Sequence, residues 1–256
     1  MPRRSGHNFS DATLNPEVVA RCSRAHAAMR IGARLLWQRA SGGKELEEDE
    51  HVDVRQTMNP IETLGAEAAG CRRCPLYAAA SQTVFGEGPA PAPLMLVGEQ
   101  PGDQEDIAGR PFVGAAGVLL DRALRDAGLD RRAIYVTNVV KHFKFLQRGK
   151  RRLHQKPTVP EIRACLSWLQ REMAVVRPQA AMALGATAAR ALTGRDLKIG
   201  AVRGSRLRLD NGVDLRVTVH PSYLLRLQNE AVRAREYDAF VADLRQVADL
   251  APLHHP

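Results

Sequence analysis

The chain has no apolar run long enough to cross a membrane, and its first residues lack the apolar stretch of a secretory signal. We therefore expect a cytoplasmic protein with no membrane partner. Cysteine is scarce, with four in 256 residues. Because thiols stay reduced in the cytoplasm, these cysteines are expected to be metal ligands or buried fillers and not disulfides.

Acidic residues are absent between Asp130 and Glu161, although the chain holds 28 of them. This gap contains the basic segment, residues 141–156, in which lysines and arginines are mixed with two histidines and two phenylalanines. A basic segment with aromatic residues suits the binding of single-stranded or opened nucleic acid. A net charge of +9 also favours a polyanionic partner. The plainer alternative is a solvated charged loop.

The composition changes near residue 58. Residues 16–40 have apolar side chains at helical spacing, and a Gly-Gly pair and an acidic run beginning at Glu45 follow them. We interpret residues 1–58 as a helical extension with an acidic linker, and residues 59–256 as the main domain.

Short apolar runs alternate with longer helical patterns in the main domain. Val118 and its neighbours are expected to face inward from a helix at 115–127. Alternation of this kind predicts an α/β fold with a mostly parallel sheet between helices. The expected strands are 94–97, 134–140, 180–184, 206–209 and 215–219, and the other expected helices are 160–176, 186–192 and 230–250.

Ligands of such sheets lie beyond the carboxyl ends of the strands. Three segments follow expected strand ends: the turn that starts at Gly98, the pair Asn138 and Lys141, and the turn that starts at His220. These segments are the first candidates for a binding site.

Cys71 and Cys74 form a Cys-x-x-Cys pair, and Cys165 lies on an expected helix. Three thiolates do not complete a tetrahedral site, so a fourth ligand is needed. Cys22 and His142 are the two candidates. The pattern by itself fits zinc as well as iron and sulfur.

Three longer motifs occur in a set order. Residues 98–114 read Gly-Glu-Gln-Pro-Gly-Asp-Gln-Glu-Asp-Ile-Ala-Gly-Arg-Pro-Phe-Val-Gly, residues 135–141 read Tyr-Val-Thr-Asn-Val-Val-Lys, and residues 219–226 read Val-His-Pro-Ser-Tyr-Leu-Leu-Arg. Together they resemble the motifs of the iron-sulfur uracil-DNA glycosylases of family 4. The resemblance spans residues 71–250 and does not reach the first sixty or so residues.

This resemblance implies a three-layer αβα fold and a [4Fe-4S] cluster. The family holds its cluster with four cysteines, and three of these positions match Cys71, Cys74 and Cys165. The remaining position is occupied by His142, which makes this histidine the favoured fourth ligand, since cluster iron accepts imidazole.

The histidine at 142 and the run Lys-Arg-Arg-Leu-His at 150–154 resemble the UdgX branch, apart from Leu153 where that branch has isoleucine. Members of the branch excise uracil and are then captured on DNA by a loop histidine, which matches His154 here. A positioned neutral imidazole is a strong nucleophile toward C1′. The alternative is that His154 is one more cationic contact.

The other motif positions suggest roles in the same reaction. Phe112 is expected to stack on a flipped uracil, and Asn138 to pair with its O4 and N3–H. We expect His220 to donate to uracil O2 as negative charge develops, and Glu99 to stabilise the sugar. The remaining expected substrate contacts are Gln100, which is expected to exclude or misplace water, with Asp103, Ser222 and Arg152.

The sequence thus predicts a monomeric uracil-DNA glycosylase that acts on uracil-containing DNA, with single strands preferred, and that attaches itself to the abasic sugar through His154. One alternative is an ordinary glycosylase in which water attacks. Another is a non-catalytic protein that binds uracil or abasic DNA.

Overall fold

The computed structural model describes residues 59–251, and its centre is a five-stranded sheet with the order β2-β1-β5-β7-β6. The first four strands in this order run parallel, and only β6 is antiparallel to its neighbour β7. This arrangement confirms the predicted mostly parallel sheet. The strands are β1 (Leu94–Gly98), β2 (Ile134–Asn138), β5 (Ala180–Leu184), β6 (Leu207–Arg208) and β7 (Asp214–Thr218).

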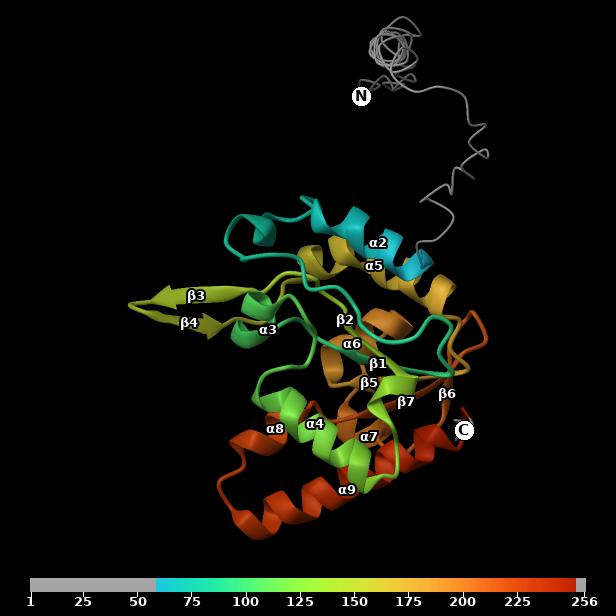
Figure 1. Ribbon diagram of the computed structural model, residues 1–256. Helices are drawn as coiled ribbons and strands as arrows, with labels where there is room; N and C mark the ends of the chain where they lie inside the picture. Colours follow the sequence, from blue (N-terminus) through green and yellow to red (C-terminus); the bar gives the residue numbers. More distant parts are fainter. Residues whose placement is uncertain (1–58, 252–256) are drawn as a thin grey trace, which may run out of the picture. The chain divides into compact units, whose positions relative to one another are not determined.

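Helices cover both faces of the sheet, which gives the predicted three layers (Figure 1). One hydrophobic core lies between the sheet and the α2 side, and a second lies between the sheet and the α4 side. The first side is formed by α2 (Pro60–Ala69), α5 (Val159–Val176), α6 (Ala186–Thr193) and α7 (Ile199–Val202). The second is formed by α4 (Ala115–Asp126), α8 (Pro221–Arg226) and α9 (Glu230–Ala248), and the short helix α3 (Asp103–Ala108) follows β1.

The helix ends follow ordinary capping chemistry. Thr158 and Glu161 form a capping box at the start of α5, where Pro160 fits the first turn. One expectation about α4 is wrong: Val118 is 64% exposed and does not face the core. The helix buries Leu120, Ala123 and Leu124, which lie on another side of the helix.

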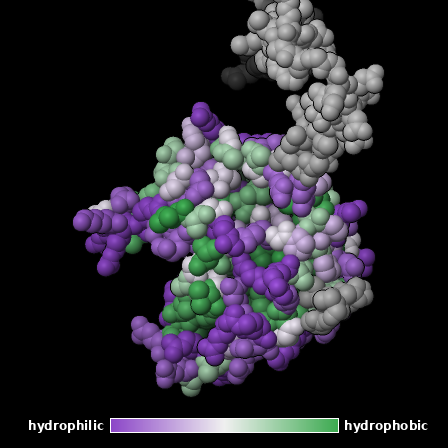
Figure 2. Space-filling view, viewed as in Figure 1, coloured by the Kyte–Doolittle hydropathy of each residue, from purple (hydrophilic) through white to green (hydrophobic). Residues whose placement is uncertain are grey.

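The basic segment contains a β-hairpin, whereas the sequence indicated a loop here. Strands β3 (Phe145–Arg148) and β4 (Arg151–His154) pair antiparallel, with Phe145 opposite His154. Gly149 begins the two-residue turn with a φ of 59°, a conformation that glycine adopts readily. The hairpin projects from the body as a hydrophilic arm, at the left of Figures 1 and 2.

Within residues 59–251, none of the helices is both long enough and apolar enough to span a bilayer. The expected helix at 16–40, the acidic linker and Cys22 lie outside the described residues.

Candidate active site and candidate cluster site

Four parallel strands end at one edge of the sheet, and each end contributes a polar side chain. Glu99 follows β1, Asn138 ends β2, Thr187 lies in the first turn after β5, and His220 follows β7. Parallel pairing places these ends side by side. The three segments predicted from strand ends therefore meet at one place in the fold.

A cavity of about 120 Å³ opens at this edge. Phe112 forms part of its wall with a φ of 54°, which is rare for a residue other than glycine. Two glycines make room for it: a Cβ at Gly98 would collide with the Phe112 ring, and a Cβ at Gly117 would collide with the Phe112 carbonyl. The cavity is lined by Gln100, Gly102, Glu105, Phe112, Ala116, Asn138, His154, His220 and Ser222.

Asn138 carries an unused acceptor in this cavity. Its side chain is buried, and Oδ1 makes no hydrogen bond to any residue in the described part of the chain. A buried carbonyl oxygen without a partner is unfavourable and is rare in folded proteins. The amide is therefore arranged to accept a hydrogen bond from a ligand.

His220 is held as a donor. The backbone N–H of Ser222 donates to His220 Nδ1 at 3.2 Å, so Nδ1 is an acceptor and the ring proton of the neutral form is on Nε2. Burial, with smaller contributions from the neighbouring His154 and Arg226, lowers the pKa of His220 to about 4. The imidazole is thus neutral at physiological pH and presents one N–H.

The low pKa of His220 predicts a pH dependence of stability. Between the ordinary value of 6.5 and about 4, the unfolded chain binds a proton that the folded chain does not. Stability due to this residue is complete above pH 6.5 and falls as the pH drops toward 4. Urea unfolding at pH 7 and 4.5 is expected to show a larger loss of stability for the wild type than for His220→Ala. Equal losses would contradict the pKa of His220.

Glu99 lies between a threonine and the hairpin. Thr187 donates its hydroxyl to Glu99 Oε2, and Glu99 Oε1 lies 3.7 Å from His154 Nε2. His154 is 52% exposed, so its imidazole is open to a ligand while one nitrogen faces the carboxylate. Thr187 was missed in the sequence because a lone threonine at a helix start carries no specific signal.

Gln100 holds together the two ends of the hairpin. Its amide nitrogen donates to the Gln155 carbonyl at 2.9 Å and to the Lys144 carbonyl at 3.3 Å. The Lys144 N–H donates to Gln100 Oε1 at 3.2 Å. Gln100 therefore joins the segments before β3 and after β4, and so positions His154.

Arg152 is engaged within the protein. It contacts Asp103 and Asp106 at 2.5 Å each, and its guanidinium stacks over the rings of Phe143 and Phe145. A guanidinium bound in this way positions the hairpin and is poorly available to a phosphate. Asp103 likewise anchors Arg152 from α3.

Two acids of α3 are buried, which is unusual for charged side chains. Asp106 is fully buried and also accepts from the Ser81 N–H. Glu105 is buried and accepts the N–H groups of Gly102 and Gly114. The bonds of Glu105 fix the start of α3 and the turn that follows Phe112, which is a structural role.

Three thiols meet on the α2 side of the sheet. Cys71, Cys74 and Cys165 are buried and free of disulfides. Burial raises the pKa of Cys165 to about 11, although the Lys141 N–H donates to its sulfur and acts in the opposite direction. Cys74 and Cys165 interact directly, and Trp168 Nε1 donates to Cys71 Sγ at 3.2 Å. The three thiols therefore lie close to one another beside α5.

His142 is next to Lys141 and is also buried. Its Nδ1 has no hydrogen-bond partner among residues 59–251, and burial lowers the pKa of the ring. No three His, Cys, Asp or Glu side chains in the described residues are arranged around a single metal ion. A cluster differs from a single ion, because each of its irons takes a separate protein ligand.

Lys141 joins the two sites. Its Nζ is fully buried and binds Glu172 at 2.5 Å and the Asn138 carbonyl at 2.7 Å. Glu172 also accepts from Tyr135 and Thr137. A buried ion pair of this kind fixes the end of β2 against α5.

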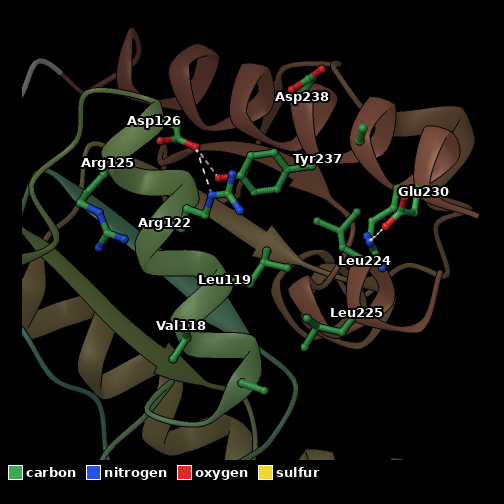
Figure 3. Close-up of a pocket in the computed structure, with 13 residues that line it drawn as sticks. Val118, Leu119, Arg122, Arg125, Asp126, Leu224, Leu225, Glu230, Tyr237 and Asp238 are labelled. Carbon is green, nitrogen blue, oxygen red and sulfur yellow. Dashed lines mark hydrogen bonds and ion pairs between the residues drawn. The ribbon is translucent and has the colours of Figure 1, made fainter. Parts of the chain in front are cut away.

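A larger cavity, of about 1160 Å³, lies elsewhere, between α4, α8 and α9 (Figure 3). Leu119, Leu224 and Leu225 form its apolar part, and Figure 2 shows apolar surface over α4 and α8. Arg122 and Asp126 pair with each other at its edge. It contains no histidine or cysteine, so the smaller cavity is the better candidate for catalysis.

Comparison with known proteins indicates a family for this chain. The family model described as the uracil DNA glycosylase superfamily matches residues 85–245. A Type-4 uracil-DNA glycosylase of Thermotoga maritima is 36% identical over 174 residues, which cover 68% of this chain and 87% of that protein. A Type-4 enzyme of Pyrobaculum aerophilum is 38% identical over 163 residues, covering 61% and 80%. A Type-5 uracil-DNA glycosylase of the same organism is 35% identical over 105 residues, covering 39% and 41%.

Proposed function

This chain belongs to the uracil-DNA glycosylase superfamily, and we propose that it excises uracil from DNA and then stays covalently attached to the abasic sugar through His154. The observation that carries the proposal is the position of His154. The hairpin root holds it beside Glu99 at the mouth of the cavity.

Recognition of the base rests on Phe112 and Asn138. A glycosylase takes its target base out of the helical stack and encloses it in a fitted pocket. The Phe112 ring offers a stacking surface, and the free Asn138 Oδ1 suits the N3–H of uracil. Cytosine has an acceptor at N3 and would leave this oxygen unpaired, which disfavours its binding.

Departure of the base is assisted by His220. Cleavage of the C1′–N1 bond leaves an electron pair on uracil, with charge on O2. The neutral His220 has its proton on Nε2 and can donate it in a hydrogen bond to that oxygen. Stabilising developing charge with a fixed donor is the largest single contribution in many enzymes.

Capture follows by attack of the His154 Nε2 lone pair on C1′. A bond forms between Nε2 and C1′ as the bond from C1′ to N1 breaks, and uracil leaves with the electron pair. The imidazolium then loses its Nδ1 proton to solvent. Glu99 faces both the ring and the expected sugar, so its negative charge stabilises the cationic sugar.

The hairpin favours this outcome over turnover by water. Gln100 and Arg152 hold the root of the hairpin, so His154 has a high effective concentration at the sugar. Ordinary turnover with water remains the second candidate, because the relatives with 36–38% identity are Type-4 glycosylases.

We also propose that Cys71, Cys74, Cys165 and His142 hold a [4Fe-4S] cluster. The three buried thiols and the unpartnered His142 Nδ1 fit such a group. Cys22 is the other sequence candidate and lies outside the described residues. When bound, the cluster would supply a structural cross-link between the Cys71 segment and α5. A redox role is not needed, because glycosidic cleavage transfers no electrons.

The remaining parts of the proposal come from the sequence. They are a division into an extension at 1–58 and a glycosylase domain at 59–256, a monomeric state, a cytoplasmic location, and a preference for single-stranded uracil-containing DNA. The exposed basic hairpin supports the last of these, since it offers cations to a flexible backbone.

The test is a denaturing gel. The protein is mixed with a labelled uracil-containing oligonucleotide, heated in detergent and separated, with a thymine oligonucleotide as the control. We expect a slowly migrating band with uracil only. Free DNA that breaks at the uracil position after alkali would instead establish ordinary turnover. Intact DNA throughout would favour a protein that binds without catalysis.

A further inference from the structure

The hydroxyl of Thr83 lies between His142 and the main chain at the end of α2. Thr83 Oγ1 donates to the Ala68 carbonyl at 3.0 Å, and it lies 3.0 Å from His142 Nε2. A hydroxyl has one hydrogen, and a carbonyl oxygen only accepts. Because the Ala68 bond uses that hydrogen, Thr83 Oγ1 accepts from His142, and the ring proton is on Nε2.

This assignment leaves His142 Nδ1 with a bare lone pair. Nδ1 is buried and has no partner among the described residues. A metal-binding imidazole usually donates its other ring N–H to a neighbouring oxygen, which fixes the tautomer and the ring orientation. We propose that Thr83 is a positioning residue that holds His142 in the tautomer with Nδ1 free for iron. The inference rests on the proposed cluster.

The same hydroxyl connects two ligand segments. The Ala68 carbonyl accepts from Thr83 and also from the Cys71 N–H at 3.0 Å. Thr83 therefore ties the turn that carries Cys71 to the segment that carries His142. Loss of the hydroxyl would release the imidazole and weaken the link between the two ligands.

The surrounding backbone makes a sharp test possible. Val84 N–H donates to the Lys141 carbonyl at 2.8 Å, which holds the 83–84 segment beside His142 without the hydroxyl. Valine has nearly the shape of threonine, so Thr83→Val removes the hydroxyl and keeps this backbone bond. Thr83→Ser keeps the hydroxyl and removes only the methyl group.

The experiment measures iron and sulfide per full-length chain, and the rate of iron loss to a chelator. We expect Thr83→Val to hold iron about 10- to 100-fold more weakly than the wild type, and Thr83→Ser to hold it nearly as well as the wild type. Thr193→Val is the matched control, because Thr193 also donates to a main-chain carbonyl, that of Ala189. His142→Ala sets the level expected when the ligand is absent.

The outcomes separate the two proposals. A wild type without iron overturns the cluster itself. Iron in the wild type with equal retention in Thr83→Val overturns the role of Thr83 and leaves the cluster standing. Weak iron retention in both Thr83→Val and Thr83→Ser would show a packing effect, and this result would also overturn the positioning role of Thr83. Urea unfolding checks that each variant is folded, and Thr83→Ala replaces the valine variant if that one is not.

Discussion

Replacing His154 with serine is expected to abolish the heat-stable DNA adduct completely. Serine is too short to reach from the hairpin root to the sugar carbon and, with no adjacent base, is a poor nucleophile. Phe112, Asn138 and His220 keep their contacts in the variant, so uracil is still bound and its departure is still assisted. The space left by the imidazole admits water. We therefore expect free DNA with an abasic site, seen on a denaturing gel before and after alkali.

The matched control for this variant is Arg148→Ser. Arg148 lies at the exposed end of β3, where it pairs with Arg151 beside the turn, and it is far along the arm from the root. The adduct should persist in this variant, although lower charge is expected to weaken the first encounter at moderate salt. An adduct that survives in His154→Ser would disprove capture by this histidine.

Replacing His220 with alanine is expected to lower the rate of uracil excision about 100- to 1,000-fold, the usual effect of removing one donor to a developing anion. The loss should appear in single-turnover rates at saturating protein, because the missing hydrogen bond acts in the transition state. Adduct formation should slow by the same factor, since capture depends on departure of the base.

The Ser222→Ala variant tests whether the rate depends on the His220 N–H itself or on the side chain that contacts the other ring nitrogen. Both the Ser222 hydroxyl, at 2.9 Å, and the Ser222 backbone N–H, at 3.2 Å, contact His220 Nδ1, and the backbone N–H remains in this variant to keep the proton on Nε2. We expect a much smaller loss of rate than in His220→Ala. If the two variants lost equal activity, the Ser222 hydroxyl would be the important group, and the donor assigned to His220 would be wrong.

The middle of the central sheet could be predicted because β1 and β5 are continuous apolar runs. All five residues of β1 and of β5 are buried, which is typical of parallel strands covered on both faces. The ends of the parallel strands β1, β2 and β7 then indicated that Glu99, Asn138 and His220 lie together. Val118 was misjudged because it lies in an apolar run whose helical periodicity does not show which face meets the sheet.

The hairpin and the supporting residues could not be predicted in the same way. Leu146 and Leu153 are exposed, so β3 and β4 have no buried face and no alternating pattern. The contacts of Gln100, Arg152 and Thr83 join segments that are 44 to 59 positions apart or bind main-chain atoms. Spacing along the chain does not reveal contacts of this kind.

The reactive imidazole is at the root of the arm, whereas the exposed positive charges of Arg148, Lys150 and Arg151 are at its tip. Gln100 and Arg152 hold this root in the folded protein. The conformational entropy of His154 is therefore lost when the protein folds. It is not lost again when DNA binds. Lengthening or shortening the tip should change how fast DNA is found and leave the geometry of bond formation unchanged. The tip of the arm thus serves the search for DNA, and the root of the arm serves the reaction.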